Sequence, residues 1–168
     1  MGWIQDGAYD HEGWVANVLD DGRASSGTAI GGVLLREVTA ADRVAGYQIR
    51  ALGSSEEVII PWDRVATWQV HCECGWRGSS RPAVADEHGD KDCPETIEDD
   101  FLPEWKDHVT PLVALDGLGR LVAEQRAIEA SIEEKVRLAR RHGASWSAIG
   151  RAALMSKQGA QQRWGGNL

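Results

Sequence analysis

Three cysteines and one histidine are the residues best suited to chemistry: Cys72, Cys74, His88 and Cys93. One residue separates the first two cysteines, thirteen residues separate Cys74 from His88, and four separate His88 from Cys93. An odd number of thiols, two of them this close, suits metal ligation better than a disulfide framework. Thiolates and imidazoles are the ligands of tetrahedral Zn²⁺. We therefore predict one structural zinc ion bound by these four side chains, with no position left for a catalytic water.

Two alternatives to this ligand set stay open. Cys72 and Cys74 occupy alternate positions of an expected strand, so both thiols could simply be buried on its inward face. His71 is a second candidate ligand, but in a regular strand it points to the opposite face, which makes His88 the preferred fourth ligand. The Cys-x-Cys-Gly segment resembles half of a zinc-ribbon knuckle, one residue shorter than the common Cys-x-x-Cys.

The sign of the charge changes near the end of the chain. The 168 residues carry a net charge of −8, yet residues 135–168 contain seven Lys and Arg and no Asp or Glu. The other 134 residues hold 11 basic and 26 acidic side chains, which gives a net charge of −15. This asymmetry is expected where only one part of a chain meets a polyanion, and an ordinary solvated helix face is the alternative.

Within this basic segment, the pattern predicts two short helices. Ser145 can cap a helix over residues 146–154, and Ser156 can cap a second helix over residues 157–164. Ala160 and Trp164 are four residues apart, so they would place one face of the second helix in a small core. The opposite face would carry polar and basic side chains. This is the arrangement of a helix-turn-helix, whose second helix lies in the major groove of DNA.

The stretch ARRHGASWSAIGRAALMSKQGAQQRW resembles the helix-turn-helix domains of bacterial transcription regulators and of the promoter-reading end of sigma factors. The resemblance covers residues 129–166. It rests on a small residue after an isoleucine (Gly150), a turn that ends in serine, and a following recognition helix. Leu154 departs from the pattern, because glycine is common at this turn position, so the turn needs a different backbone solution or starts one residue away. The resemblance implies a sequence-specific DNA-binding regulator.

The side chains of this segment suit two kinds of contact with DNA. Glutamine can bridge adenine N6 and N7, lysine can donate to guanine O6 and N7, and a serine at a helix start can hold a phosphate. Arginines at phosphates add affinity without sequence information. The residues expected to read bases are Lys157, Gln158, Gln161 and Gln162. The other expected DNA-binding residues are Ser147, Ser156, Arg140, Arg141, Arg151 and Arg163.

The secondary structure that must position the metal ligands and the DNA-binding residues is expected to be that of an α+β protein. Residues 1–110 form a β-rich domain with the Cys/His cluster, expected as a small antiparallel sheet or partial barrel. The expected strands are 13–19, 31–38, 45–52, 56–61 and 66–72. Short helices joined by loops are expected over residues 75–110. Residues 111–142 predict a linking helix of about 25 residues that ends at Gly143, and residues 143–168 predict the helix-turn-helix.

These observations predict a cytoplasmic, bacterial DNA-binding regulator. No stretch has the length and apolarity of a membrane span or an export signal. A homodimer joined through the long helix would read a partly palindromic operator, since each head covers few base pairs. No phosphate-binding loop, His-Glu-x-x-His or nucleophile elbow occurs, and His11 and His108 are interpreted as isolated residues, so no enzyme is expected. A zinc-containing adaptor for RNA polymerase or another protein, and an enzyme directed to nucleic acid, are the alternatives.

Overall fold

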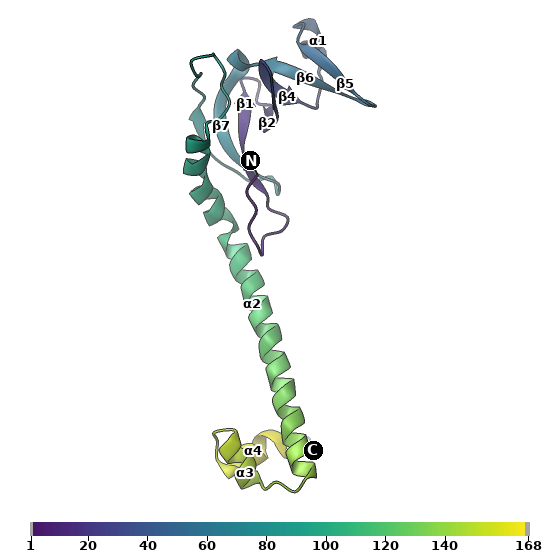
Figure 1. Cartoon of the computed structure of the whole chain (residues 1–168), viewed down its shortest axis with the longest axis vertical. Coiled ribbons are helices and arrows are strands. Elements are labelled where there is room, and N and C mark those ends of the chain that lie inside the picture. The colour runs from purple at the N-terminus through teal and green to yellow at the C-terminus, as the bar shows by residue number, and fades with distance from the viewer. Residues whose placement is uncertain (1, 167–168) are drawn as a thin grey trace. The chain divides into compact units, whose positions relative to one another are not determined.

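The computed structural model describes residues 2–166. The chain divides into two compact units, Met1–Leu115 and Asp116–Leu168, which we call unit 1 and unit 2. A long helix, α2 (Glu95–Arg141), contributes its first turns to unit 1 and its remaining turns to unit 2 (Figure 1). The fold class is α+β, as the sequence predicts.

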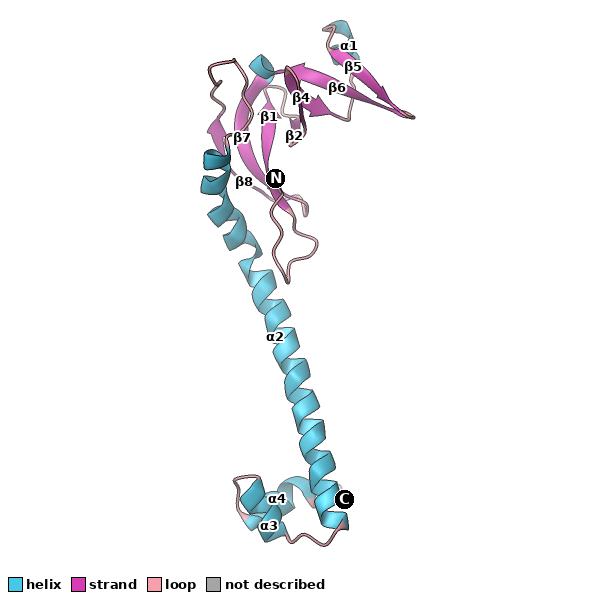
Figure 2. Ribbon diagram, in the orientation of Figure 1, coloured by secondary structure: helices cyan, strands magenta, loops and turns pink. Residues whose placement is uncertain are grey.

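Unit 1 contains two antiparallel sheets of four strands each within the described residues (Figure 2). The first has the order β2-β1-β7-β8, formed by Ala24–Ser25, Gly13–Leu19, Val65–Cys72 and Arg77–Pro82. The second has the order β3-β4-β6-β5, formed by Thr28–Ala29, Gly32–Leu35, Ser55–Pro61 and Gln48–Leu52. Helix α1 (Ala40–Val44) precedes β5, and the short 3₁₀ helix η1 (Trp62–Arg64) connects β6 to β7.

The first turns of α2 cover one face of the first sheet. Phe101, Trp105 and Val109 recur every four residues, so they share one helix face, and each is almost fully buried. They pack with Val15 of β1 and with Val70 of β7 in one hydrophobic core. The second sheet has its own core, formed by residues from β1, β4, β6, η1 and β7. Sheet and helix therefore hold the end of β7 beside the early turns of α2.

Helix α2 begins at Glu95, sixteen residues before the expected start at residue 111, and it contains Pro103 and Pro111. Residues 75–94, where short helices are expected, form β8 and loops instead. A proline inside a helix costs about 3 kcal/mol, but burial of each large apolar side chain returns about 2 kcal/mol. The packing of Phe101, Trp105 and Val109 on the sheet offsets the cost of the two prolines. Among the described residues, no helix is both long and apolar enough to cross a membrane.

Two short helices follow α2 in unit 2. Helix α3 spans Trp146–Ala152 and helix α4 spans Lys157–Trp164. The side chain of Ser145 accepts a hydrogen bond from the Ala148 amide, and that of Ser156 accepts one from the Gly159 amide. The two predicted serine caps are confirmed. The helices and the end of α2 enclose a small core of Val136, Ile149, Ala160 and Trp164.

Candidate functional site

Two cysteines and two histidines converge in unit 1. The ligand atoms of His11, Cys72, Cys74 and His108 all lie within 4.8 Å of one another. Cys72 Sγ is 3.5 Å from His11 Nδ1, and Cys74 Sγ is 3.4 Å from His108 Nε2. Two thiols and two imidazoles at this spacing are compatible with a four-coordinate metal site.

A tight turn after β7 places the two cysteines. The strand ends at Cys72, whose carbonyl accepts a hydrogen bond from the Gly75 amide at 2.9 Å. Gly75 has a φ of +92°, a conformation that residues with a Cβ rarely adopt. The Cys72 amide donates to the Trp76 carbonyl at 2.9 Å, which starts the return toward β8. Cys74 therefore lies exposed in the turn, and not on the inward face of a strand beside buried Cys72 as the alternation suggests.

The two histidines come from the elements that pack beside this turn. His11 lies two residues before β1, and Gly13 of β1 is paired with Cys72 in the sheet. His108 lies on α2, three residues after Trp105 and therefore near the same helix face. A Cβ on Gly13 would lie only 2.3 Å from the Trp105 indole nitrogen, so the glycine permits the close approach of helix and strand. This packing brings both imidazoles to the cysteine turn.

Two pKa shifts in the group act on metal binding in opposite directions. Burial, together with the neighbouring His11, lowers the pKa of His108, so its imidazole stays neutral around neutral pH. A neutral imidazole is the form that ligates metal. Burial raises the pKa of the Cys72 thiol. A bound metal ion would reverse that effect, because it stabilises the thiolate directly.

The structure brings together only two of the four ligands that the sequence suggests. His88 is exposed in a loop, where its amide donates to the Asp86 carboxylate at 2.8 Å, and it lies outside the converging group. Cys93 also lies outside the group, and burial, followed by the charges of Glu98 and Asp92, raises its pKa to about 12. The open alternative, His71, is buried and lies 3.1 Å from the Gln69 side-chain oxygen.

The sequence interpretation of His11 and His108 as isolated residues is corrected by this geometry. His11 is 61 residues from Cys72, and His108 is 34 residues from Cys74. No spacing motif covers such separations. The sequence contains only an indirect indication of these ligands. His11 comes just before β1 and His108 lies on α2, and apolar residues of both elements pack against β7, the strand that ends at Cys72.

The residues expected to read DNA bases lie on one helix of unit 2. In α4, Ala160 and Trp164 are buried in the small core. The exposed residues of this helix include Lys157, Gln158, Gln161 and Gln162. Ser156 is exposed, and its hydroxyl oxygen accepts the Gly159 amide at 3.0 Å. The helix thus separates an apolar face from a face of one lysine and three glutamines.

Of the four arginines expected at phosphates, two are exposed without a ring contact and two lie against tryptophan rings. Arg141 and Arg151 are exposed, as is Ser147 of α3. Arg140 is half-buried: its guanidinium lies 4.6 Å from the centre of the Trp146 ring system and donates to the Ala144 carbonyl at 2.6 Å. Arg163 is exposed and lies over the Trp164 ring at 5.3 Å. Arg140 therefore also helps to hold α3 against the end of α2.

A close helix contact and an unusual turn residue join α3 to α4. A Cβ on Gly150 would lie 2.8 Å from the Met155 carbonyl oxygen, so only glycine fits without a shift. The Met155 amide donates to the Gly150 carbonyl at 2.8 Å. Leu154 adopts a φ of +56° and is 94% exposed. Leu154 therefore occupies the turn in a left-handed backbone conformation, which glycine could adopt without strain.

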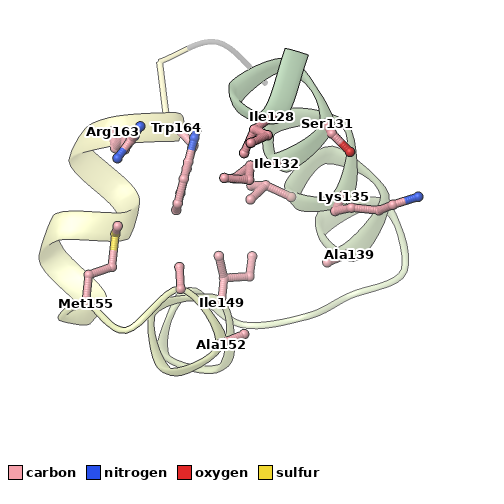
Figure 3. A pocket seen from close by; sticks show the side chains of 12 residues that line it. Ile128, Ser131, Ile132, Lys135, Ala139, Ile149, Ala152, Met155, Arg163 and Trp164 are labelled. Carbon is pink, nitrogen blue, oxygen red and sulfur yellow. The ribbon is translucent and has the colours of Figure 1, made fainter. Parts of the chain in front are cut away.

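An apolar groove lies between α2, α3 and α4. Its volume is about 590 Å³, and Ile132, Ile149 and Trp164 contribute side chains from the three helices. Figure 3 shows these three side chains directed toward a common space, whereas the Lys135 ammonium points away from it.

The candidate residues thus form two separate groups. The metal-compatible group belongs to unit 1, and α3 and α4, which contain no acidic residue, belong to unit 2. Comparisons of the chain with protein-family models, curated proteins and solved structures find no match.

Proposed function

We propose that this protein is a sequence-specific DNA-binding transcription regulator. In this proposal the end of α2 together with α3 and α4 acts as a helix-turn-helix, and α4 enters the major groove. The observation that carries the proposal is the division of α4 into two faces. Ala160 and Trp164 anchor one face in the core, while the other face exposes one lysine and three glutamines in a segment without a single acid.

The position of the polar residues on α4 supports base reading. Recognition helices contact base edges mainly with their N-terminal residues. Lys157 and Gln158 are the first two residues of α4, and Gln161 follows one turn later on the same side. Glutamine can pair with adenine and lysine with guanine through the major groove. Because the Ser156 oxygen already caps the helix, its role is to orient α4 rather than to contact bases.

The charge distribution supports the choice of DNA as the partner. The acid-free segment carries seven Lys and Arg, and the remaining chain has a net charge of −15. Basic groups near phosphates release counterions and so contribute affinity that falls with salt. The acidic remainder would be repelled from the duplex, which directs unit 2 to the DNA.

A homodimer completes the proposal, since two linked heads can read a partly palindromic operator. Several large apolar side chains of α2 are exposed, including Leu118, Leu121, Ile128 and Ile132. They recur at spacings of three, seven and four residues, which places them along one side of the helix. Two copies of α2 could bury this side against each other.

We further propose that the metal of unit 1 is a structural Zn²⁺. His11, Cys72, Cys74 and His108 supply two sulfur and two nitrogen ligands, a set typical of closed structural zinc sites. All four positions of a tetrahedron would be filled by side chains, which leaves no place for a substrate or a catalytic water. The ion would tie the turn after β7 to α2 and to the segment before β1.

Selection from random oligonucleotides with the full-length protein at moderate salt tests the DNA proposal. We expect one enriched, partly palindromic sequence. Gln161→Ala should relax the preference at one position of each half-site, at a cost of about 1 to 3 kcal/mol on the preferred base. Arg151→Gln should weaken binding to all sequences and reduce the salt slope by about 1.

Arg126→Gln is the matched control for the arginine variant, because Arg126 is exposed on α2 outside the acid-free segment. It should leave both affinity and salt slope unchanged. Failure to enrich any sequence would refute the proposal. Retention of RNA polymerase by the protein in the absence of DNA would favour the adaptor function instead.

A further inference from the structure

The indole N–H of Trp105 is a buried donor that lacks an acceptor. Trp105 belongs to α2, three residues before His108, and is only 1% exposed. Its Nε1 is buried, and among residues 2–166 it forms no hydrogen bond of regular geometry. Buried N–H groups in native proteins are nearly always paired, so this one calls for a partner.

The position of this N–H is defined by Gly13 of β1. A Cβ on Gly13 would lie 2.3 Å from Trp105 Nε1 and 2.4 Å from its Cδ1, so the N–H edge of the indole occupies the space of the missing side chain. Gly13 is paired with Cys72 across the sheet. Side chains of directly opposed residues lie on the same face, with their Cβ atoms about 4.5 to 5.5 Å apart. The N–H edge therefore lies beside the Cys72 side chain, which packs in the same core.

Cys72 supplies an acceptor whose strength depends on its state. The backbone carbonyls of Trp3 and Gly13 already accept hydrogen bonds from each other's amides, at 2.9 and 2.6 Å. A thiol sulfur is a weak acceptor, whereas hydrogen bonds to an ionised group are roughly twice as strong as neutral ones. Ligation of a metal through Cys72 would therefore turn a poor partner of the indole N–H into a good one.

The electrostatics of Cys72 agree with an N–H directed at its sulfur. Burial raises the pKa of the Cys72 thiol, while the Cys74 amide and the Trp105 side chain act in the opposite direction. The two cysteines are placed differently: Cys72 is 3% exposed and lies beside a buried donor, whereas Cys74 is exposed next to His108. The two sulfurs therefore differ in their hydrogen-bonding surroundings.

We propose that Trp105 is a positioning residue of the metal centre, whose indole N–H donates a hydrogen bond to the metal-bound Cys72 sulfur. The inference rests on the metal site proposed above and assigns a role to a residue outside its four ligands. The hydrogen bond holds the direction of the sulfur, as partners outside the ligand set do for metal-binding histidines. It also withdraws electron density from the sulfur, which makes Cys72 a weaker electron donor to the metal than Cys74.

Loading the full-length protein with Co²⁺ tests the hydrogen bond, because the thiolate-to-cobalt charge-transfer absorption reports the energy of the sulfur electrons. A hydrogen bond lowers that energy, so its loss should move the band to longer wavelength. Trp105→Phe keeps an aromatic ring in the core and removes the N–H. We expect this variant to show the shift and to bind Co²⁺ about tenfold more weakly, as measured by competition with a chelator.

Trp68→Phe is the matched control. Trp68 is 4% exposed in the same core, but its indole N–H donates to the Lys91 carbonyl at 2.9 Å. The control removes the same atoms from the same core and should leave the band at its original wavelength. An unshifted band in Trp105→Phe, or an equal shift in both variants, would overturn the proposal. Absence of any thiolate band from the unaltered protein would refute the metal site itself, and this inference with it.

A second measurement needs no variant, so it does not depend on whether Trp105→Phe folds. In the unaltered protein loaded with a magnetic isotope of cadmium, NMR can detect scalar coupling between the metal and a proton across an N–H···S hydrogen bond. We expect the indole proton of Trp105 to show this coupling. Cadmium that couples to the Hβ protons of Cys72 and Cys74, but not to this indole proton, would contradict the hydrogen bond while leaving the metal site in place.

Discussion

The imidazole of His108 lies flat on the indole of Trp76, with ring centroids 4.3 Å apart and planes 5° from parallel. His108 belongs to α2, and Trp76 follows the turn that carries Cys74. The stack therefore links the two elements that meet at the metal-compatible group. It also limits rotation of the ring whose Nε2 lies 3.4 Å from Cys74 Sγ.

Loss of this stack should weaken metal binding without abolishing it. Residues that orient a metal-ligating histidine typically change the affinity 10- to 100-fold, so we expect Trp76→Ala to weaken Zn²⁺ binding about tenfold. Competition with a chromogenic chelator measures the constant. Trp14→Ala is the control, because Trp14 contacts His71, which lies outside the group. Equal affinities of the Trp76 variant and the unaltered protein would contradict an orienting role.

The identity of the ligands can be decided by metal content. Protein purified without added metal should contain about one zinc per chain, the content of a single four-ligand site. Cys74→Ser and His108→Ala should each reduce this content strongly, whereas Cys93→Ser and His88→Ala should leave it unchanged. Elemental analysis by mass spectrometry gives the result. Loss of zinc from the Cys93 variant would instead restore the ligand set suggested by sequence spacing.

Stability should depend on pH through the buried Asp42. Its carboxylate accepts two hydrogen bonds from the Arg23 guanidinium at 2.8 Å and further bonds from Thr39, and the Arg23 bonds in particular hold the pKa of Asp42 well below its usual range. A depressed carboxyl pKa contributes stability that is present above the unfolded value, about 4, and is lost as the pH falls further.

Asp42→Asn should therefore lower the free energy of unfolding by about 3 to 5 kcal/mol at pH 7, because it breaks a buried pair. The difference from the unaltered protein should stay constant from pH 8 to about 5 and shrink below about 4. Urea denaturation across this range measures it, with the exposed Asp63→Asn as a control. A difference that persists unchanged below about pH 3 would argue against the ion pair as its source.

The contact between α3 and α4 should be intolerant of a methyl group. Gly150→Ala would place a Cβ 2.8 Å from the Met155 carbonyl oxygen, and the forced shift should cost about 2 kcal/mol. Gly117→Ala is the control: no atom lies within 4 Å of its added Cβ, and the helix should gain up to about 1 kcal/mol. Hydrogen exchange of the α3 and α4 amides would show the loss. Unchanged protection in the Gly150 variant would mean that the contact accommodates the methyl group without loss of stability.

The turn residue should behave in the opposite way. Leu154 adopts a left-handed conformation with its side chain 94% exposed, so Leu154→Gly should relieve backbone strain of about 1 kcal/mol and lose little packing. Leu154→Ala retains a Cβ and should bring no gain. Hydrogen exchange of the α3 and α4 amides compares the stability of the two variants. A gain from alanine equal to that from glycine would show that the backbone is not the cause.

Much of the local structure was accessible from the sequence, because it depends on neighbouring residues. An apolar run followed by the turn residues Asp20, Asp21 and Gly22 predicted β1 over residues 13–19, and alternating apolar residues predicted β7 close to its observed bounds. Ser145 and Ser156 predicted the starts of α3 and α4, since the capping hydrogen bonds are made within three residues. The predicted start of α2 was wrong, because Pro103 and Pro111 suggest a break that only the packing of the helix on the sheet overrides.

The sequence by itself determined which strands and caps form, the separation of charge along the chain, and Cys72 and Cys74 as a potential metal-binding pair. Those features follow from local periodicity, side-chain type and short spacing. Only the tertiary structure decided that His11 and His108 meet these cysteines, and that His88 and Cys93 do not. The four ligand atoms converge because α2 packs its Trp105 face against β1 and β7, in which Gly13 is paired with Cys72. This contact joins residues far apart in the sequence, so the spacing of the cysteines and histidines does not predict it.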